Sequence, residues 1–273
     1  MTGAPAGRRP VTGQRVVVTG AGNGIGAALA EAFAAAGARV VVNDLDAAAA
    51  ARTAARTGGT AVPGDAAGRD GVARLIEAAR AELGGIDVYC ANAGVAPAGG
   101  PEAPEALWSA AWEVNVMAHV RAAELLLPEW LERGAGRFVA TVSAAGLLTM
   151  LGSAPYSVSK HAALSFAEWL SATYRHRGIR VHALCPQGVR TQLLAESGEL
   201  GQALMGAGAL EPAEVAAETL RAIEQERFLV LPHPEVAQFY AVRATDPDRW
   251  LDGMNRLQRK FVTDGPSGTE EGR

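Results

Sequence analysis

Tyr156 and Lys160 are the residues whose types and spacing most directly suggest chemistry. They are four positions apart at the start of an expected helix that begins near Ala154, so both side chains project from one helix face. A phenol in water has a pKa of about 10, and a nearby ammonium stabilises the phenolate. We therefore expect Lys160 to make Tyr156 usable as an acid or base near neutral pH. Only Lys160 and Lys260 are lysines among the 25 basic residues, which also singles out Lys160.

Ser143 is a second polar residue in a position suited to ligand contact. It follows an apolar run of the sequence that is expected to be a strand. Parallel sheets place ligand-contacting residues directly after the carboxyl ends of their strands. The Ser143 hydroxyl is therefore predicted to hold a substrate oxygen.

A glycine-rich turn occupies residues 19–26, Thr-Gly-Ala-Gly-Asn-Gly-Ile-Gly, between an expected strand and an expected helix. Such a turn lets backbone amides approach a pyrophosphate closely, and the helix N-terminus adds partial positive charge. Glycine is needed because a Cβ atom would obstruct both the turn and the approach. The order of strand, turn and helix predicts a dinucleotide site.

Asp44 ends the next expected strand, eighteen residues after Gly26. A carboxylate there can accept hydrogen bonds from both hydroxyls of an adenosine ribose, and it would repel a 2′-phosphate. Neither Asn23 nor Leu45 supplies a cation that would bind such a phosphate. The sequence thus favours NAD over NADP, while a role for Asp44 as a helix cap, with Asp46 nearby, stays open.

Taken together, the turn at 19–26, Asn92-Ala93-Gly94, Ser143 and the run Tyr156-Ser157-Val158-Ser159-Lys160 resemble the short-chain dehydrogenase/reductase family over about residues 12–231. The resemblance implies that Tyr156 is the catalytic acid/base. It implies that Lys160 lowers the pKa of Tyr156 and binds the nicotinamide ribose, and that Ser143 orients the substrate oxygen. It also implies that Asn115 holds a water that connects Lys160 to solvent.

The same resemblance implies further contacts with the cofactor. Ile25 would pack near the pyrophosphate, Asp65 would contact the adenine ring, and Asn92 would stabilise the central sheet beside the cofactor. The predicted cofactor residues are Gly20, Gly22, Asn23, Gly24, Ile25, Gly26, Asp44, Leu45, Asp65, Ala66, Asn92, Ala93, Gly94, Tyr156, Lys160, Pro186, Gly188, Val189 and Thr191. Two residues depart from the family pattern: Gln187 stands where glycine is usual beside the nicotinamide, and Ala91 replaces the first Asn of Asn-Asn-Ala-Gly.

The expected substrate pocket is mostly apolar. It is predicted to be lined by Val95, Ser143, Leu147, Leu148, Met150, Gln187, Leu193 and Leu194, with Leu151, Leu204 and Met205 nearby. This lining favours an apolar or aromatic alcohol over a sugar or a charged metabolite. Some of these residues could instead pack in the core, and that alternative stays open. Residues 192–210 contain four glycines and are predicted to form a mobile lid over the substrate.

The elements that must position these residues alternate along the chain. Continuously apolar strand candidates occur at 15–19, 38–43, 60–63, 86–90, 136–142, 179–184 and 228–231, and helical patterns at 24–36, 46–56, 69–83, 104–132, 155–177 and 212–226. This alternation predicts an α/β fold of the Rossmann type, with a doubly wound parallel sheet of about seven strands covered by helices on both faces.

We expect one domain over residues 1–273, with flexible ends at 1–11 and 263–273 and a C-terminal helical extension at 234–261. Within the extension, residues 247–261 show apolar positions at helical spacing. This helix could pack on its own core, on a partner subunit or over the substrate mouth. The resemblance also implies a homodimer or homotetramer formed through the helices near 104–132 and 155–177.

Composition excludes several other classes of protein. The net charge of −4 and the dispersed basic residues argue against binding of nucleic acid or an anionic membrane. No apolar run is long enough to span a bilayer, and no secretion signal is recognisable, so a cytoplasmic location is expected. The two cysteines and five histidines show no metal-ligand spacing.

The predicted function is reversible, NAD-dependent oxidation of a secondary alcohol to a ketone. Two alternatives stay open: an NADPH-dependent ketoreductase of a biosynthetic pathway, and a non-catalytic dinucleotide-binding sensor or scaffold. A sensor needs only the glycine turn and Asp44, so Tyr156, Lys160 and Ser143 argue for an enzyme.

Overall fold

The computed structural model describes residues 11–263, apart from the side chains of residues 199–200 and 261–263. The expectation of flexible ends therefore falls outside the described residues, except at Val11 and Thr263. Val11 is buried in the core, and Thr263 ends the last helix. Flexibility of the two ends stays a prediction.

Seven parallel strands form a single sheet. They are β1 (Arg15–Val18), β2 (Arg39–Val42), β3 (Thr60–Ala61), β4 (Val88–Ala91), β5 (Gly136–Thr141), β6 (Ile179–Leu184) and β7 (Leu229–Val230). Their order across the sheet is β3-β2-β1-β4-β5-β6-β7, with Val17 of β1 paired to Val41 of β2 and to Tyr89 of β4. Because the strand order reverses between β1 and β4, a crevice opens there at the carboxyl ends of the strands. The predicted doubly wound parallel sheet is confirmed.

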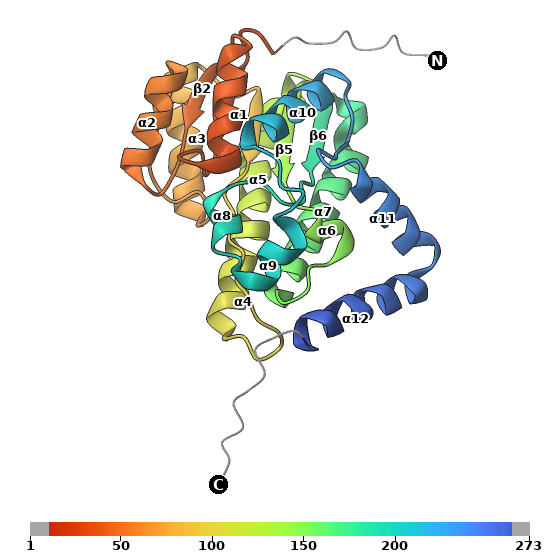
Figure 1. Ribbon diagram of the computed structural model, residues 1–273. Coiled ribbons are helices and arrows are strands. Elements are labelled where there is room, and N and C mark those ends of the chain that lie inside the picture. The colour runs from red at the N-terminus through yellow and green to blue at the C-terminus, as the bar shows by residue number, and fades with distance from the viewer. Residues whose placement is uncertain (1–10, 264–273) are drawn as a thin grey trace, which may run out of the picture.

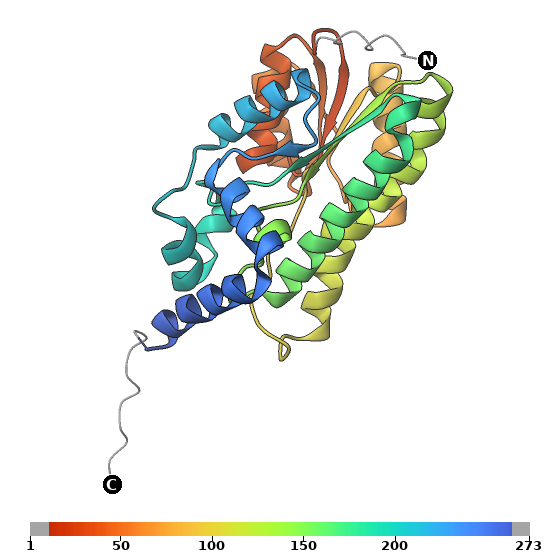
Figure 2. The same cartoon turned by 90° about the vertical axis from the view of Figure 1, so that its right-hand side faces the viewer.

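Helices cover both faces of the sheet (Figures 1 and 2). One layer contains α1 (Gly24–Ala35), α2 (Ala47–Thr57) and α10 (Pro212–Glu224), and the other contains α3 (Arg69–Leu83), α5 (Ala118–Glu132) and α7 (Ala154–Tyr174). Leu29 and Phe33 belong to the first core, and Leu126 and Trp130 to the second. Burial on both faces explains why the strands read as continuous apolar runs rather than alternating ones.

Local signals set several helix ends. Asp46 caps α2, its carboxylate accepting from the backbone N–H of Ala48 and Ala49. Gly84 ends α3 in the left-handed conformation, and Gly178 does so after the 3₁₀ turn η2 (Arg175–Arg177) that extends α7.

The single helix predicted at 104–132 is interrupted. The structure has α4 (Glu105–Trp112), a π-helical turn η1 (Glu113–Met117) and then α5. Within this turn the Asn115 side chain bonds outside the helix, since Oδ1 accepts from Val95 N and Nδ2 donates to Val95 O. Apolar periodicity does not report a change from i,i−4 to i,i−5 pairing, so the interruption is not visible in the sequence pattern.

Three short helices were not predicted: α6 (Ala145–Leu148), α8 (Gln192–Ala195) and α9 (Gly198–Met205). Helices α8 and α9 lie within the segment 192–210 that was predicted as a lid. Each spans only a turn or two, which is too short for helical periodicity to register.

The C-terminal extension consists of α11 (Glu235–Thr245) and α12 (Pro247–Thr263), where a helical extension was expected. Figures 1 and 2 both show α12, in dark blue, projecting from the body of the molecule. Trp250 packs partly against the core and lies 6.3 Å from the Phe239 ring, whereas Leu251 is 62% exposed. In this chain α12 thus packs on its own subunit through only part of its surface.

Two absences apply to the part of the chain that is described. No helix within residues 11–263 is long and apolar enough to cross a bilayer. Among the same residues, no three His, Cys, Asp or Glu side chains gather in a way that could hold a metal ion.

Candidate active site

The fold brings four predicted catalytic residues to the carboxyl end of the sheet. Ser143 lies two residues after β5, Tyr156 and Lys160 lie on the first turns of α7, and Asn115 lies in η1. The Ser143 hydroxyl is hydrogen bonded to Tyr156, and the Lys160 Nζ atom is 5.7 Å from the Tyr156 ring centre. Asn115 donates through Nδ2 to Ser159 Oγ at 3.0 Å, which links η1 to the same helix.

Ser143 has an unusual backbone conformation. Its φ is +127°, a region that residues with a Cβ rarely adopt, so this position stores strain. Contacts with the end of β6 and the segment after it hold Ser143 there: Ser143 N donates to Leu184 O at 3.2 Å, and Ala144 N donates to Pro186 O at 2.8 Å. The hydroxyl is therefore positioned by two neighbouring strand ends at once.

Burial and one side-chain contact act on the pKa of Tyr156 in opposite directions. Burial raises the pKa of Tyr156 above its ordinary value, and the hydrogen bond with Ser143 is the contact that lowers it. The prediction that Lys160 lowers this pKa stays a prediction. Both side chains are removed from water, and desolvation disfavours the charged form of each.

Lys160 is buried to 3% exposure in the same cluster. Burial lowers the pKa of Lys160 from 10.5 to about 8. Its Nζ atom donates to Thr141 O at 2.9 Å, so β5 fixes the position of the ammonium. Lys160 is thus close to its titration range at mildly alkaline pH.

Gly94 leaves a gap between Lys160 and Asn115. A Cβ atom at this position would lie 3.4 Å from Lys160 Nζ and 3.2 Å from Asn115 Oδ1. Only the missing side chain keeps this space open between the two polar groups. The water predicted to connect Asn115 and Lys160 stays a prediction.

The glycine turn requires glycine at several of its positions. Gly20 and Gly24 have φ of +59° and +54°. A Cβ atom on Gly22 would lie 2.8 Å from Asp44 Oδ2, and one on Gly26 would lie 2.1 Å from Gly20 O. Gly20 and Gly24 therefore allow the left-handed backbone of the turn, and Gly22 allows the Asp44 carboxylate to approach. Gly26 allows α1 to pack closely against the end of β1.

The start of α1 suits a phosphate group. No side chain caps this helix at Asn23, and its first turn contains no acidic residue. Its first N–H groups therefore have no side-chain acceptor at the cap, while the helix dipole adds positive potential. These features fit the pyrophosphate of a dinucleotide.

Asp44 is held against the glycine turn. Its Oδ2 atom accepts from Gly22 N at 2.8 Å and its Oδ1 atom accepts from Asp46 N at 3.0 Å. Because Asp46 caps α2, the open alternative that Asp44 is the helix cap is not supported. Leu45, the next residue, is 78% exposed, so the carboxylate and an apolar surface lie side by side.

Two further predicted cofactor residues have structural contacts of their own. Asp65 accepts from Ala67 N and Gly68 N, at the start of α3. Asn92 donates to Thr19 O at 2.9 Å and accepts from Thr141 Oγ1 at 3.0 Å, which ties the ends of β1, β4 and β5 together.

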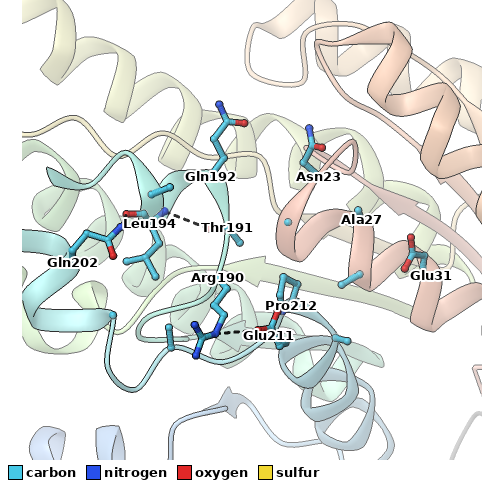
Figure 3. A pocket seen from close by; sticks show the side chains of 16 residues that line it. Asn23, Ala27, Glu31, Arg190, Thr191, Gln192, Leu194, Gln202, Glu211 and Pro212 are labelled. Atoms are coloured by element: carbon cyan, nitrogen blue, oxygen red, sulfur yellow. Dashed lines mark hydrogen bonds and ion pairs between the residues drawn. The ribbon is translucent and has the colours of Figure 1, made fainter.

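An open cleft of about 770 Å³ lies beside the glycine turn, between α1 and the segment after β6. Figure 3 shows Asn23, Ala27 and Glu31 on the α1 side and Thr191, Gln192 and Leu194 opposite. Four predicted site residues line it: Asn23, Gly24, Thr191 and Leu194. An ion pair of 3.0 Å between Arg190 and Glu211 closes its lower edge in that view.

The predicted substrate residues separate into two groups. Leu147 and Leu148 are buried in the core, so the alternative of core packing holds for both. Met150 extends toward the lid, since its Cε atom lies 3.7 Å from the position of a Cβ on Gly201. Gln187, Leu204 and Met205 line a second cavity of about 230 Å³, together with Gly188, Gly208, Glu235 and Phe239.

Two residues near this site were not predicted from the sequence. His233 contacts Gln187 and Gly208, and Arg243 on α11 donates to Leu147 O. Each lies outside the motifs and contacts a segment far away in the sequence, so no spacing pattern signals it.

The chain resembles proteins of known activity. The family model of the short chain dehydrogenases matches residues 14–200. The chain is 38% identical over 269 residues to 1-deoxy-11-beta-hydroxypentalenate dehydrogenase of Streptomyces arenae, covering 93% of this chain and 91% of that one. It is 31% identical over 263 residues to 17-beta-hydroxysteroid dehydrogenase 13 of Rattus norvegicus, covering 93% and 86%. A short chain dehydrogenase/reductase of Burkholderia phymatum, solved in complex with NAD, matches with a TM-score of 0.80 and 30% identity, covering 88% and 96%.

Proposed function

Because the chain belongs to the short-chain dehydrogenase family, we propose that it catalyses reversible, NAD-dependent oxidation of a secondary alcohol on an apolar molecule to a ketone. The single observation that carries this proposal is the cluster of Ser143 with the buried side chains of Tyr156 and Lys160 at the carboxyl end of the sheet. A dinucleotide sensor would not require these three residues.

The cofactor residues fit a dinucleotide. The glycine turn and the start of α1 would hold the pyrophosphate, Asp44 the adenosine ribose, and Tyr156 with Lys160 the nicotinamide ribose. Val189 and Thr191 would contact the carboxamide. When bound, the nicotinamide supplies the acceptor for the hydride that leaves the carbinol carbon.

The protein's own residues handle the proton. The Ser143 hydroxyl donates a hydrogen bond to the substrate oxygen, and the Tyr156 phenolate takes the proton from that oxygen during oxidation. In the reverse direction the Tyr156 phenol donates this proton to the ketone oxygen. Lys160, fixed by Thr141, places its ammonium near the phenol and the ribose.

The raised pKa of Tyr156 gives this mechanism a pH dependence. In the free protein the phenol is protonated at neutral pH, because burial raises its pKa. Oxidation requires the phenolate, so its rate should rise as pH increases above neutrality, whereas reduction uses the phenol and should not require alkaline pH. An oxidation rate that rises between pH 7 and 9 while the reduction rate stays flat would support this assignment, and parallel slopes would contradict it.

A preference for NAD follows from the Asp44 carboxylate, which would repel a 2′-phosphate, and from exposed Leu45, which offers no cation. The alternative is NADPH dependence. Fluorescence titration with NADH and NADPH separates the two, because NADH should bind at least tenfold more tightly. Asp44→Ala should reduce this ratio, and an unchanged ratio would show that Asp44 does not set it.

An apolar substrate is proposed on two grounds. Met150, Leu204, Met205 and Phe239 lie at the lid and the second cavity. The two curated relatives are named as dehydrogenases of a hydroxypentalenate and of a hydroxysteroid. Both names describe a hydroxyl group on a polycyclic carbon skeleton. A panel of alicyclic and steroid alcohols with NAD, compared with sugars, is the direct test.

We extend the proposal to a homodimer or homotetramer formed through α4 and α7. Trp112 on α4 and Val158 and Trp169 on α7 are 45%, 51% and 54% exposed, which is unusual for such large apolar side chains. Light scattering after gel filtration would measure the assembly, and a monomer at micromolar concentration would exclude it.

Tyr156→Phe is the central test of the enzyme assignment. It should abolish turnover in both directions while NADH still binds, because the ring remains and only the proton-transferring hydroxyl is lost. Tyr174→Phe, near the end of the same helix, is the matched control and should keep full activity. If Tyr156→Phe retains undiminished turnover, the assignment is wrong. If the wild type binds NADH but oxidises no alcohol in the panel, the sensor alternative is favoured.

A further inference from the structure

His233 lies between β7 and α11 and joins two segments that are distant in the sequence. It is 3% exposed, its Nδ1 atom is 3.1 Å from Gln187 N, and its Nε2 atom is 3.2 Å from Gly208 O. The Gln187 N–H is a donor, so Nδ1 accepts. The Gly208 carbonyl is an acceptor, so Nε2 carries the proton and donates. These two bonds assign one neutral tautomer to the ring.

One partner of His233, Gln187, precedes the lid, residues 192–210, and the other, Gly208, lies within the lid near its end. The stems of the lid are joined by a short backbone ladder, in which Arg190 N donates to Leu210 O at 2.9 Å and Leu210 N donates to Gly188 O at 3.0 Å. The ion pair of Arg190 with Glu211 reinforces this ladder, although both side chains are 60% exposed. The hydrogen bonds of His233 thus connect the lid to the protein at a buried position, beside the exposed ion pair.

The lid also touches the segment after β6 at one close approach. A Cβ atom on Gly188 would lie 2.1 Å from Met205 O, so only glycine lets the end of α9 approach this segment. The second cavity lies at the same place, and Gln187, Gly208 and Phe239 are among its walls. His233 thus bonds to two residues of the cavity wall, Gln187 and Gly208.

The backbone at Gln187 is compatible with its departure from glycine. Gln187 is not among the residues with positive φ, so a side chain is accommodated there without backbone strain. Its N–H is fixed by His233 rather than left to a mobile loop.

We propose that His233 is a positioning residue that fixes the lid and the nicotinamide-proximal residue Gln187 in one arrangement over the substrate. It acts through these two backbone groups and does not itself take part in proton or hydride transfer. The kinetic consequence rests on the proposed function, whereas the structural consequence for the lid does not.

Three substitutions separate the two bonds. His233→Phe keeps a ring and removes both bonds. His233→Asn keeps an acceptor as far from Cα as Nδ1, so it can retain the bond from Gln187 N. His233→Gln keeps a donor as far from Cα as Nε2, so it can retain the bond to Gly208 O.

Two measurements read out the proposal: hydrogen–deuterium exchange of residues 188–210 by mass spectrometry, and KM and kcat for the best alcohol with NAD. In His233→Phe we expect exchange across the lid and the KM for the alcohol to rise about tenfold, because the bond that holds the lid at Gly208 O is lost with the bond at Gln187 N. The value of kcat should change less than twofold, because the proton-transfer residues are untouched. His233→Gln should restore slow exchange in the lid, and His233→Asn should not.

His176→Phe is the matched control, because His176 is exposed on η2 and contacts neither segment. It should leave exchange and KM unchanged. If the His233 variants lower only the melting temperature and leave lid exchange as in the wild type, His233 is merely structural and the proposal is overturned. Should His233→Phe fail to fold, the Asn and Gln variants carry the same comparison. If the wild type oxidises no alcohol, the proposed function fails, and lid exchange alone still decides the role of His233.

Discussion

Replacing Lys160 by methionine should stabilise the free protein while abolishing turnover. Lys160 is 3% exposed, and burial lowers its pKa from 10.5 to about 8. The folded state therefore disfavours the ammonium that the unfolded chain carries freely. Methionine has a similar length and no charge, so Lys160→Met removes this cost of desolvation.

The magnitude follows from the shift in pKa. The folded-state pKa is lowered, so at pH 7 both states are protonated and the folded protein bears the whole cost. At about 1.4 kcal/mol for each pKa unit, the change from 10.5 to about 8 corresponds to about 3 kcal/mol. Losing the hydrogen bond to Thr141 O offsets about 1 kcal/mol of this. The net gain at pH 7 is about 2 kcal/mol, or a rise of about 4 °C in melting temperature.

The pH dependence gives the sharper test. Between about pH 8 and 10.5 the unfolded chain binds more protons at residue 160 than the folded protein does. The free energy of unfolding of the wild type therefore increases with pH in this range, relative to that of Lys160→Met. Above pH 10.5 the cost is absent and the advantage of the variant disappears. Urea unfolding of both proteins at pH 7 and pH 10 measures this difference directly.

Lys260→Met is the matched control, because Lys260 is the other lysine of the chain and is exposed on α12. Its substitution should change the free energy of unfolding by less than about 0.5 kcal/mol at either pH. The reasoning is refuted if Lys160→Met is less stable than the wild type at pH 7, or if its effect is the same at pH 7 and pH 10.

Three further substitutions test contacts that hold the fold. Gly26→Ala should lower the free energy of unfolding in urea by about 3 kcal/mol, because its Cβ would lie 2.1 Å from a backbone oxygen. Gly58→Ala is the control and should cost about 1 kcal/mol, since Gly58 has φ of +63° but open space around it. Equal costs for the two variants would contradict the packing argument. Asp46→Ala should lower the free energy of unfolding by about 1 kcal/mol, because it removes the cap of α2. If hydrogen–deuterium exchange rises only outside α2, loss of this cap is not the cause. Burial raises the pKa of Asp87, but the bonds from Arg15 outweigh this effect, so the folded-state pKa is lowered. Asp87→Asn should therefore lower the free energy of unfolding by about 1 kcal/mol above pH 3.8. The difference in stability between wild type and variant should vanish as pH falls through the folded-state pKa.

The central fold was predictable because its signals are local. Strands buried on both faces appear as apolar runs, and Gly84 and Gly178 mark helix ends whatever surrounds them. The turn at Asn115 was not predictable, since its side chain bonds to Val95, twenty residues away. The helices α8 and α9 were also missed, because short helices carry little periodicity.

In the candidate site too, some features follow from the sequence pattern and others depend on the three-dimensional packing. Tyr156 and Lys160 could be identified from their spacing alone. The direction of the Tyr156 pKa could not, because it depends on how completely the fold buries the phenol. Leu147 shows the same limit: an apolar residue after a strand end suits a pocket or a core equally, and only the three-dimensional packing decides for the core.

The two edges of the sheet are short, since β3 and β7 each contain only two residues. An edge of this length presents few unpaired backbone groups to another chain, which limits pairing between sheets of separate molecules. Concentrated or briefly heated preparations should consequently resist the growth of intermolecular β-structure. Lengthening β3 or β7 by substitutions of high strand propensity is the change that would remove this protection.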